Sequence, residues 1–269
     1  AMELGCIYAL VALALFISYT TLNIADLSTD GCFTLGCAVG AIVTLCGHPV
    51  LALFAAMGSG VISGFVTAFL QTRMGVESIL AGIIVNTGLY TINIMVMGFS
   101  SNVNIFRADT IFSLVHDQTE DIPLIGSWYK LIIVLLIVLL VGIILAWFLN
   151  TRLGLSIRAT GDNPAMVRAS SINPAFTITA GLMLSNSLTA LSGSLVAQMQ
   201  KSADINAGSG IVTVGLACLI TGETLIGKRS LTRNVLAAVI AFALGVAVTL
   251  LCLKRRNREP HEKDKEDGP

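Results

Sequence analysis

The most constraining feature of this chain is a set of long runs without a single charged residue. Four of them cover residues 131–151, 169–200, 205–222 and 234–253. A helix needs about 20 mainly apolar residues to cross a membrane, and most of these runs are long enough. Only 12% of the 269 residues are charged, whereas soluble domains carry about 25%. We therefore predict an all-α, multi-pass membrane protein.

The runs and their boundaries predict eight membrane spans. We place them at residues 4–24, 33–46, 50–71, 78–99, 131–149, 175–199, 209–221 and 234–253. The spans at 33–46 and 209–221 are too short to cross a bilayer alone, so we expect them to be broken or half-spanning helices.

A polar, basic segment at about residues 150–174 separates the fifth and sixth spans. Asn163 is a suitable N-cap and Pro164 suits the first helical position. The same dipeptide recurs at Asn173, where the next span begins. The segment predicts a short helix, about 163–171, that docks onto a partner protein. Placing it in the cytoplasm also puts most Lys and Arg residues on the inner side, as membrane topology favours.

The C-terminal region contradicts this topology. We divide the chain into one transmembrane domain, residues 1–253, and a charged, disordered cytoplasmic tail, residues 254–269. Eight crossings would place that basic tail outside, against the positive-inside bias. We therefore predict eight or nine spans in total, with a further loop and helix near residues 239–242 that the given sequence skips.

Three groups of polar residues inside or between spans are candidates for a transport pathway. Polar groups at membrane depth need partners or water. One group occupies one face of the fourth span, a second lies in the sixth span, and a third lies in the break before the second span, with Phe33 beside it. These candidates are Asn86, Tyr90 and Asn93; Asn186 and Thr189, in a stripe with Ser185 and Ser192; and Asp26, Ser28, Asp30 and Phe33. Two simpler interpretations stay open: hydrogen bonding between helices, and capping of the second helix by Asp30.

Several function classes find no support in the sequence. The formal net charge is zero, so no nucleic-acid partner is indicated. The six cysteines lie in or beside apolar segments without a CxxC pair, and the three histidines are scattered, so we expect no metal site. Residues 222–229 resemble a phosphate-binding loop, but Arg229 stands where that loop needs Ser or Thr. We expect no catalytic residues and no cofactor in this chain.

Several motifs resemble the permease subunits of ATP-binding-cassette importers in the branched-chain amino acid and ribose class. The cytoplasmic coupling segment and the broken helix carry the resemblance, and the later helices extend it over nearly the whole chain. The matching stretches are residues 150–154, 161–168 and 171–173; 26–31; and 191–197 and 208–222. Within the class, residues 30–36 and 203–206 are most similar to the branch for tryptophan and other aromatic amino acids. Members of the class end with two helices after residues 227–230, whereas this chain shows one.

The resemblance implies an importer permease fold in a bacterial inner membrane. It implies two cytosolic ATPase subunits that bind ATP and Mg²⁺, an extracytoplasmic binding protein and a second permease copy, with a homodimer favoured. The coupling residues would be Arg152, Gly154, Asn163, Pro164, Met166, Val167, Arg168 and Asn173. Substrate would cross between the two permeases. An aromatic amino acid such as tryptophan is the favoured substrate; a sugar or nucleoside, or a branched-chain amino acid, is the alternative.

Two functions of another class remain. An ion-coupled secondary transporter needs ionisable groups deep in its spans, and only Asp26 and Asp30 qualify. A purely structural membrane scaffold would not need broken helices. Co-purification with an ATPase subunit would separate the three hypotheses.

Overall fold

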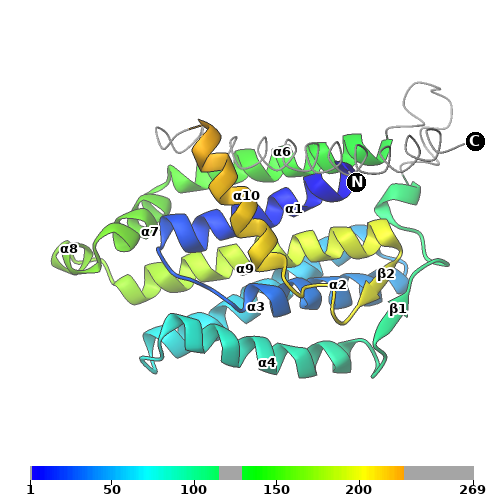
Figure 1. Cartoon of the computed structure of the whole chain (residues 1–269), viewed down its shortest axis with the longest axis horizontal. Helices are drawn as coiled ribbons and strands as arrows, with labels where there is room; N and C mark the ends of the chain where they lie inside the picture. Colours follow the sequence, from blue (N-terminus) through cyan, green and yellow to red (C-terminus); the bar gives the residue numbers. More distant parts are fainter. Residues whose placement is uncertain (1, 115–128, 227–269) are drawn as a thin grey trace, which may run out of the picture.

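The computed structural model of the chain describes residues 2–114 and 129–226. It is a helical bundle with one small sheet (Figure 1). The helices are α1 (Met2–Leu15), a π-helix (Phe16–Thr21), α2 (Thr29–Leu45), α3 (Pro49–Thr72), α4 (Ser78–Val96), α6 (Tyr129–Leu149), α7 (Arg152–Asp162), α8 (Pro164–Ala169), α9 (Pro174–Gln200) and α10 (Ile211–Ile226). Two short strands, β1 (Asn102–Asn104) and β2 (Ser202–Asp204), pair antiparallel.

Within the described residues, five helices are long and apolar enough to cross a membrane. They are α3, α4, α6, α9 and the combined α1 and π-helix over Glu3–Thr21. The apolar helix α2 is shorter, with 17 residues, and α10 is described as far as Ile226, where the described residues end. That these two helices are broken or half-spanning stays a prediction. The expected span at 234–253, the skipped helix near 239–242 and the tail at 254–269 all lie outside the described residues.

Helix α9 is the centre of the bundle and packs against α1, α2 and α3 (Figure 1). Small residues make this close packing possible. A Cβ atom at Gly36 or Gly40 of α2 would meet Ala190 or Ser194 of α9, and one at Gly64 of α3 would meet the Leu182 carbonyl. The Gly-xxx-Gly spacings of α2 and α3 thus bring two helices against adjoining stretches of α9, as expected for small residues in membranes.

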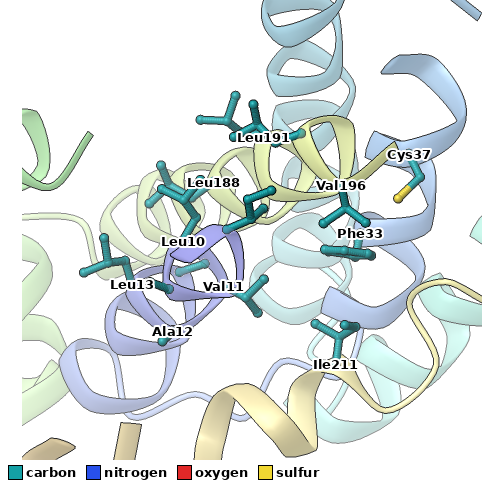
Figure 2. Packing of buried hydrophobic residues seen from close by; sticks show 14 of the residues in the cluster. Leu10, Val11, Ala12, Leu13, Phe33, Cys37, Leu188, Leu191, Val196 and Ile211 are labelled. Carbon is teal, nitrogen blue, oxygen red and sulfur yellow. The ribbon is translucent and has the colours of Figure 1, made fainter. Parts of the chain in front are cut away.

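Apolar side chains also pack between α9 and the helices around it. Figure 2 shows the ring of Phe33 from α2 beside Val196 of α9, inside a cluster that continues to Leu10 and Leu13 of α1. Phe33 is fully buried, and its ring centroid lies 6.1 Å from that of Tyr8. By contrast, α6 buries only one stripe and leaves leucines such as Leu136 and Leu139 more than half exposed, as a lipid-facing helix does.

The polar stripe of α9 is used largely for helix packing. The hydroxyls of Ser185 and Ser192 donate to the carbonyls of Ala14 and Ile7 in α1, at 2.8 and 2.9 Å. Thr189 donates to the Ser185 carbonyl within its own helix at 3.1 Å. For these three hydroxyls the structure supports the simpler interpretation, hydrogen bonding within the bundle.

The sheet and the basic segment lie at opposite ends of the bundle. In Figure 1, β1 and β2 are at the right, while α7 and α8 are at the left. The basic segment forms two helices where we expected one, because Thr151 caps an additional helix: its hydroxyl accepts from the Gly154 N–H at 3.4 Å. The sheet was not expected, since three-residue strands leave almost no pattern in the sequence.

Candidate functional site

The chain between the π-helix and α2 leaves helical geometry and places a carboxylate inside the protein. Asn23 begins the turn with a left-handed backbone (φ 55°), a conformation that asparagine tolerates better than most residues. Asp26, only 3% exposed, accepts hydrogen bonds from the Ser28 N–H and hydroxyl at 2.8 and 2.6 Å. The carboxylate therefore fixes the conformation of the break.

The same carboxylate links the break to the middle of α9. Asn186 donates its side-chain N–H to the second oxygen of Asp26 at 3.0 Å. Thr67 of α3 donates to the Ser28 hydroxyl at 3.2 Å, and the Cys32 thiol to the Asn186 carbonyl at 3.3 Å. Asp26, Ser28 and Asn186 thus tie α2, α3 and α9 together.

Asp30 does not cap its own helix. Residue Ser28 is the N-cap of α2, and it makes no side-chain capping bond. Instead, the Asp30 carboxylate accepts from the N–H groups of Gly210 and Val212 at 3.2 and 2.9 Å. These groups belong to the start of α10, so Asp30 caps a helix 180 residues further along the chain. The alternative in which Asp30 caps α2 is wrong.

The segment before α10 folds back against α2. It leaves β2 and continues through Ile205 and Asn206 to Gly208, whose N–H donates to the Thr34 hydroxyl at 3.1 Å. A Cβ atom at Gly208 would collide with the Asp30 carbonyl and the Thr34 hydroxyl, so only glycine fits this contact. We call residues 205–210 the re-entrant segment.

A polar cavity of about 320 Å³ lies between α2, α4 and the re-entrant segment. Most of its lining residues carry uncharged polar side chains, and one carries a carboxylate. The lining residues are Asp30, Gly31, Thr34, Asn86, Thr87, Tyr90, Asn93, Ile205, Asn206, Gly208 and Ser209. No arginine or lysine of the described residues lines it. The cavity can therefore hydrogen-bond a small polar molecule from several sides.

The structure brings four of the nine predicted pathway residues together in this cavity. Asp30, Asn86, Tyr90 and Asn93 line it; Tyr90 is half exposed, and Asn93 is buried and donates to the Gly31 carbonyl at 3.2 Å. The other five lie elsewhere: Asp26, Ser28 and Asn186 in the buried network, and Phe33 and Thr189 in the core.

Sequence reasoning missed the re-entrant segment as a cavity wall. Thr34, Asn206, Gly208 and Ser209 contribute to the lining and were not among the predicted residues. The glycines at 208 and 210, placed directly before an apolar run, were the available signal, because such pairs permit close backbone contacts and turns.

The predicted coupling residues divide into exposed and buried groups. The Asn163 side chain accepts from the N–H groups of Ala165 and Met166 at 3.0 and 3.1 Å, and Asn173 accepts from the Ala175 N–H at 3.0 Å. Both are therefore N-caps, as predicted. The exposed group comprises Arg152, Asn163, Pro164, Met166, Arg168 and Asn173, and the buried group Gly154 and Val167.

Helix α7 connects this surface to the broken helix. A Cβ atom at Gly161 would collide with the Thr21 carbonyl, at the end of the π-helix. The hydroxyls of Thr160 and Thr177 are 2.7 Å apart and join α7 to α9. The exposed basic segment thus rests directly on the chain that leads into the Asp26 break.

The described residues contain no group of His, Cys, Asp and Glu side chains that could hold a metal ion. The polar cavity brings hydrogen-bonding side chains of α2, α4 and the re-entrant segment together, an arrangement that suits binding of a small molecule.

Comparison with known proteins assigns the chain to a family. A family model described as "Branched-chain amino acid transport system / permease component" matches residues 2–256. The tyrosine transport system permease protein of Clostridioides difficile (strain R20291) is 33% identical over 89% of this chain and 77% of its own length. An uncharacterized protein of Rickettsia prowazekii (strain Madrid E) is 31% identical over 94% of this chain and 86% of its own length.

A third relative has a different substrate in its name. The galactofuranose transporter permease protein of Escherichia coli (strain K12) is 26% identical over 90% of this chain and 69% of its own length. No solved structure matches the chain.

Proposed function

The chain belongs to the family of permease components of branched-chain amino acid transport systems, and on this premise we propose that it forms the pathway of an importer for tyrosine or another aromatic amino acid. It is a multi-pass membrane transport subunit. The observation that carries the substrate proposal is the 33% identity with a tyrosine permease. We therefore favour an aromatic amino acid over the branched-chain amino acids of the family description.

The polar cavity supports a small polar substrate. Asn86, Thr87 and Asn206 offer hydrogen-bond donors and acceptors around it, and Tyr90 offers a half-exposed aromatic ring. Aromatic rings prefer offset or edge-on contact with other rings, so Tyr90 suits a tyrosine side chain. A sugar is the second candidate, since amide and hydroxyl groups also suit its hydroxyls and one relative is a galactofuranose permease.

Uptake into proteoliposomes tests the substrate and the energy source together. The permease is purified with its associated subunits and reconstituted, and labelled tyrosine is offered with the extracytoplasmic binding protein. We expect uptake only with ATP inside the vesicles, and competition by unlabelled tryptophan or phenylalanine. If galactofuranose competes with labelled tyrosine and unlabelled aromatic amino acids do not, the result would favour a sugar substrate. Uptake driven by an ion gradient without ATP would indicate a secondary transporter.

We propose that α8 is the docking element for a cytosolic ATPase subunit. Met166 is 66% exposed on this short helix, whereas Val167 is 3% exposed and packs inward. Docking therefore belongs to Met166 and its exposed neighbours, and Val167 supports the helix from inside. Movement of α7 and α8 would reach the Asp26 break through the contact of Gly161 with Thr21.

Met166→Asp is expected to weaken ATPase binding about 100-fold, because an unpaired charge in a docking contact costs roughly 3 kcal/mol. The permease should insert and purify normally, while ATPase co-purification and ATP-driven uptake fall together. Met166→Leu keeps an apolar side chain and should bind normally. Val167→Asp should instead lower the yield of the folded permease. Normal co-purification of the Met166→Asp variant would contradict the docking assignment.

We also propose that a second copy of the permease completes the pathway, as a homodimer. Thr87, Tyr90, Asn206 and Ser209 are exposed along the cavity, so a single copy leaves the bound molecule uncovered on that side. A second permease facing these residues would enclose it.

A further inference from the structure

We propose that Asp30 and Thr34 are positioning residues, which hold the re-entrant segment as one wall of the cavity and thereby set the affinity for the transported molecule. This inference rests on the proposed function of the cavity as the transport pathway. It adds a role that neither the polar stripes nor the coupling surface predicts.

The hydrogen-bonding capacity of Asp30 points to this indirect role. Its two carboxylate oxygens accept from the N–H groups of Gly210 and Val212. Hydrogen bonds to an ionised acceptor are stronger than neutral ones, and a negative charge at a helix N-terminus is further stabilised by the helix dipole. Asp30 lines the cavity, yet both of its oxygens are engaged with α10.

Thr34 provides a second, independent attachment. It lies one turn after Asp30 in α2, is 4% exposed, and accepts from the Gly208 N–H at 3.1 Å. Its own hydroxyl donates to the Asp30 carbonyl at 3.2 Å. Two side chains from one turn of α2 therefore hold three N–H groups at positions 208, 210 and 212.

Few other hydrogen bonds among the described residues join the re-entrant segment to the rest of the protein. At its start, the Ile205 N–H donates to the Ser101 carbonyl at 3.0 Å, next to the sheet. From there to α10, the backbone makes short-range contacts of its own: Ala207 donates to the Asp204 carbonyl, Asn206 to the Asp204 carboxylate, Ser209 to Asn206, and Ile211 to Gly208. The bonds from Asp30 and Thr34 are the ones that join it to α2. Asn206 and Ser209 lie in this stretch and line the cavity, so their positions depend on that attachment.

Cysteine labelling at position 209 tests the attachment without any transport measurement. Ser209→Cys is introduced after replacement of the six native cysteines, and a membrane-impermeant thiol reagent is applied to the assembled complex. We expect Asp30→Asn to raise the labelling rate at least about threefold, because one oxygen and the charge are lost. Thr34→Val should raise it less, and Thr34→Ser, which keeps the hydroxyl, should restore the original rate.

Thr87→Val is the matched control. Thr87 lines the same cavity from α4, but its hydroxyl donates only to the Ile83 carbonyl of its own helix, at 2.9 Å. Its replacement should therefore leave labelling at position 209 unchanged. If Asp30→Asn and Thr34→Val also leave labelling unchanged, the two residues do not hold the segment and the proposal is wrong.

Transport kinetics separate the positioning role from a general loss of structure. With labelled tyrosine, Asp30→Asn and Thr34→Val should raise KM about tenfold, equivalent to the loss of one hydrogen bond, while the maximal rate changes little. A fall in the maximal rate with unchanged KM would contradict the proposal. If the unsubstituted protein takes up no tyrosine, the substrate proposal fails, whereas the labelling rates still decide the role of Asp30 and Thr34.

Discussion

Replacing Gly64 with leucine is expected to abolish the folded permease. The first added atom at this position would meet the Leu182 carbonyl and the Met183 Cα of α9. Both are backbone atoms, so neither can turn away as a flexible side chain would. Overpacking in cores costs about 1–3 kcal/mol when side chains can adjust. Here two whole helices must separate. We therefore expect the free energy of unfolding to fall by more than about 5 kcal/mol, which is comparable with the entire stability of many proteins.

Gly58 of the same helix is the matched control. Apart from the neighbouring residues and backbone of α3 itself, no atom lies within 4 Å of a Cβ built at this position, so Gly58→Leu should fold as well as the original protein. The measurement is the amount of monodisperse permease in size-exclusion chromatography after detergent extraction. A similar loss for both variants would show that the cause is leucine in this helix in general, and not the contact of α3 with α9.

The four-residue spacing of glycines in α2 and α3 is a local pattern typical of close helix contact, whereas the identity of the partner, α9, comes from the structure. The sequence also predicted that α2 would be shorter than the spanning helices, since few apolar residues lie between its polar ends. The two N-caps at Asn163 and Asn173 followed from local chemistry, in which a short polar side chain precedes a proline. All three are properties of neighbouring residues.

Contacts between distant residues were harder to predict. Asp30 reaches the start of α10 across 180 residues, and a carboxylate next to a helix start gives no sign of which helix it caps. The same holds for Val167: both it and Met166 are apolar residues on a six-residue helix, and only the packing of α8 shows which one points inward. The cavity wall at 205–210 likewise depends on long-range bonds, those from Asp30 and Thr34.

The two hydrogen-bond networks assign different roles to Asp26, in the break, and Asp30, in the first turn of α2. Asp26 is enclosed by α2, α3 and α9, whereas Asp30 lines the cavity and holds α10. A cavity residue is expected to affect transport affinity, and an enclosed residue is expected to affect folding. The predicted consequences of replacing them therefore differ.

Asp26→Leu is expected to be the most damaging single substitution in the break. It removes the acceptor for the Ser28 N–H, the Ser28 hydroxyl and the Asn186 side chain. A buried donor left without a partner costs about 1–3 kcal/mol, so the loss of all three bonds lowers the free energy of unfolding by roughly 3–9 kcal/mol. We expect little folded protein, measured as the yield of monodisperse permease after extraction.

A reciprocal exchange tests whether the contact of Asp26 with Asn186 carries this effect. Asp26→Asn keeps an oxygen for Ser28 but turns an N–H₂ group toward the N–H₂ group of Asn186, so we expect a loss of about 2 kcal/mol. In the double variant Asp26→Asn, Asn186→Asp, the amide at position 26 donates to a carboxylate at position 186, and most of that loss should be recovered. Thermal unfolding of the two single variants and the double variant gives the coupling energy between the two positions. For residues in contact, this energy is typically about 0.5–3 kcal/mol. Additive losses would show that the 3.0 Å contact contributes nothing to the stability of the break.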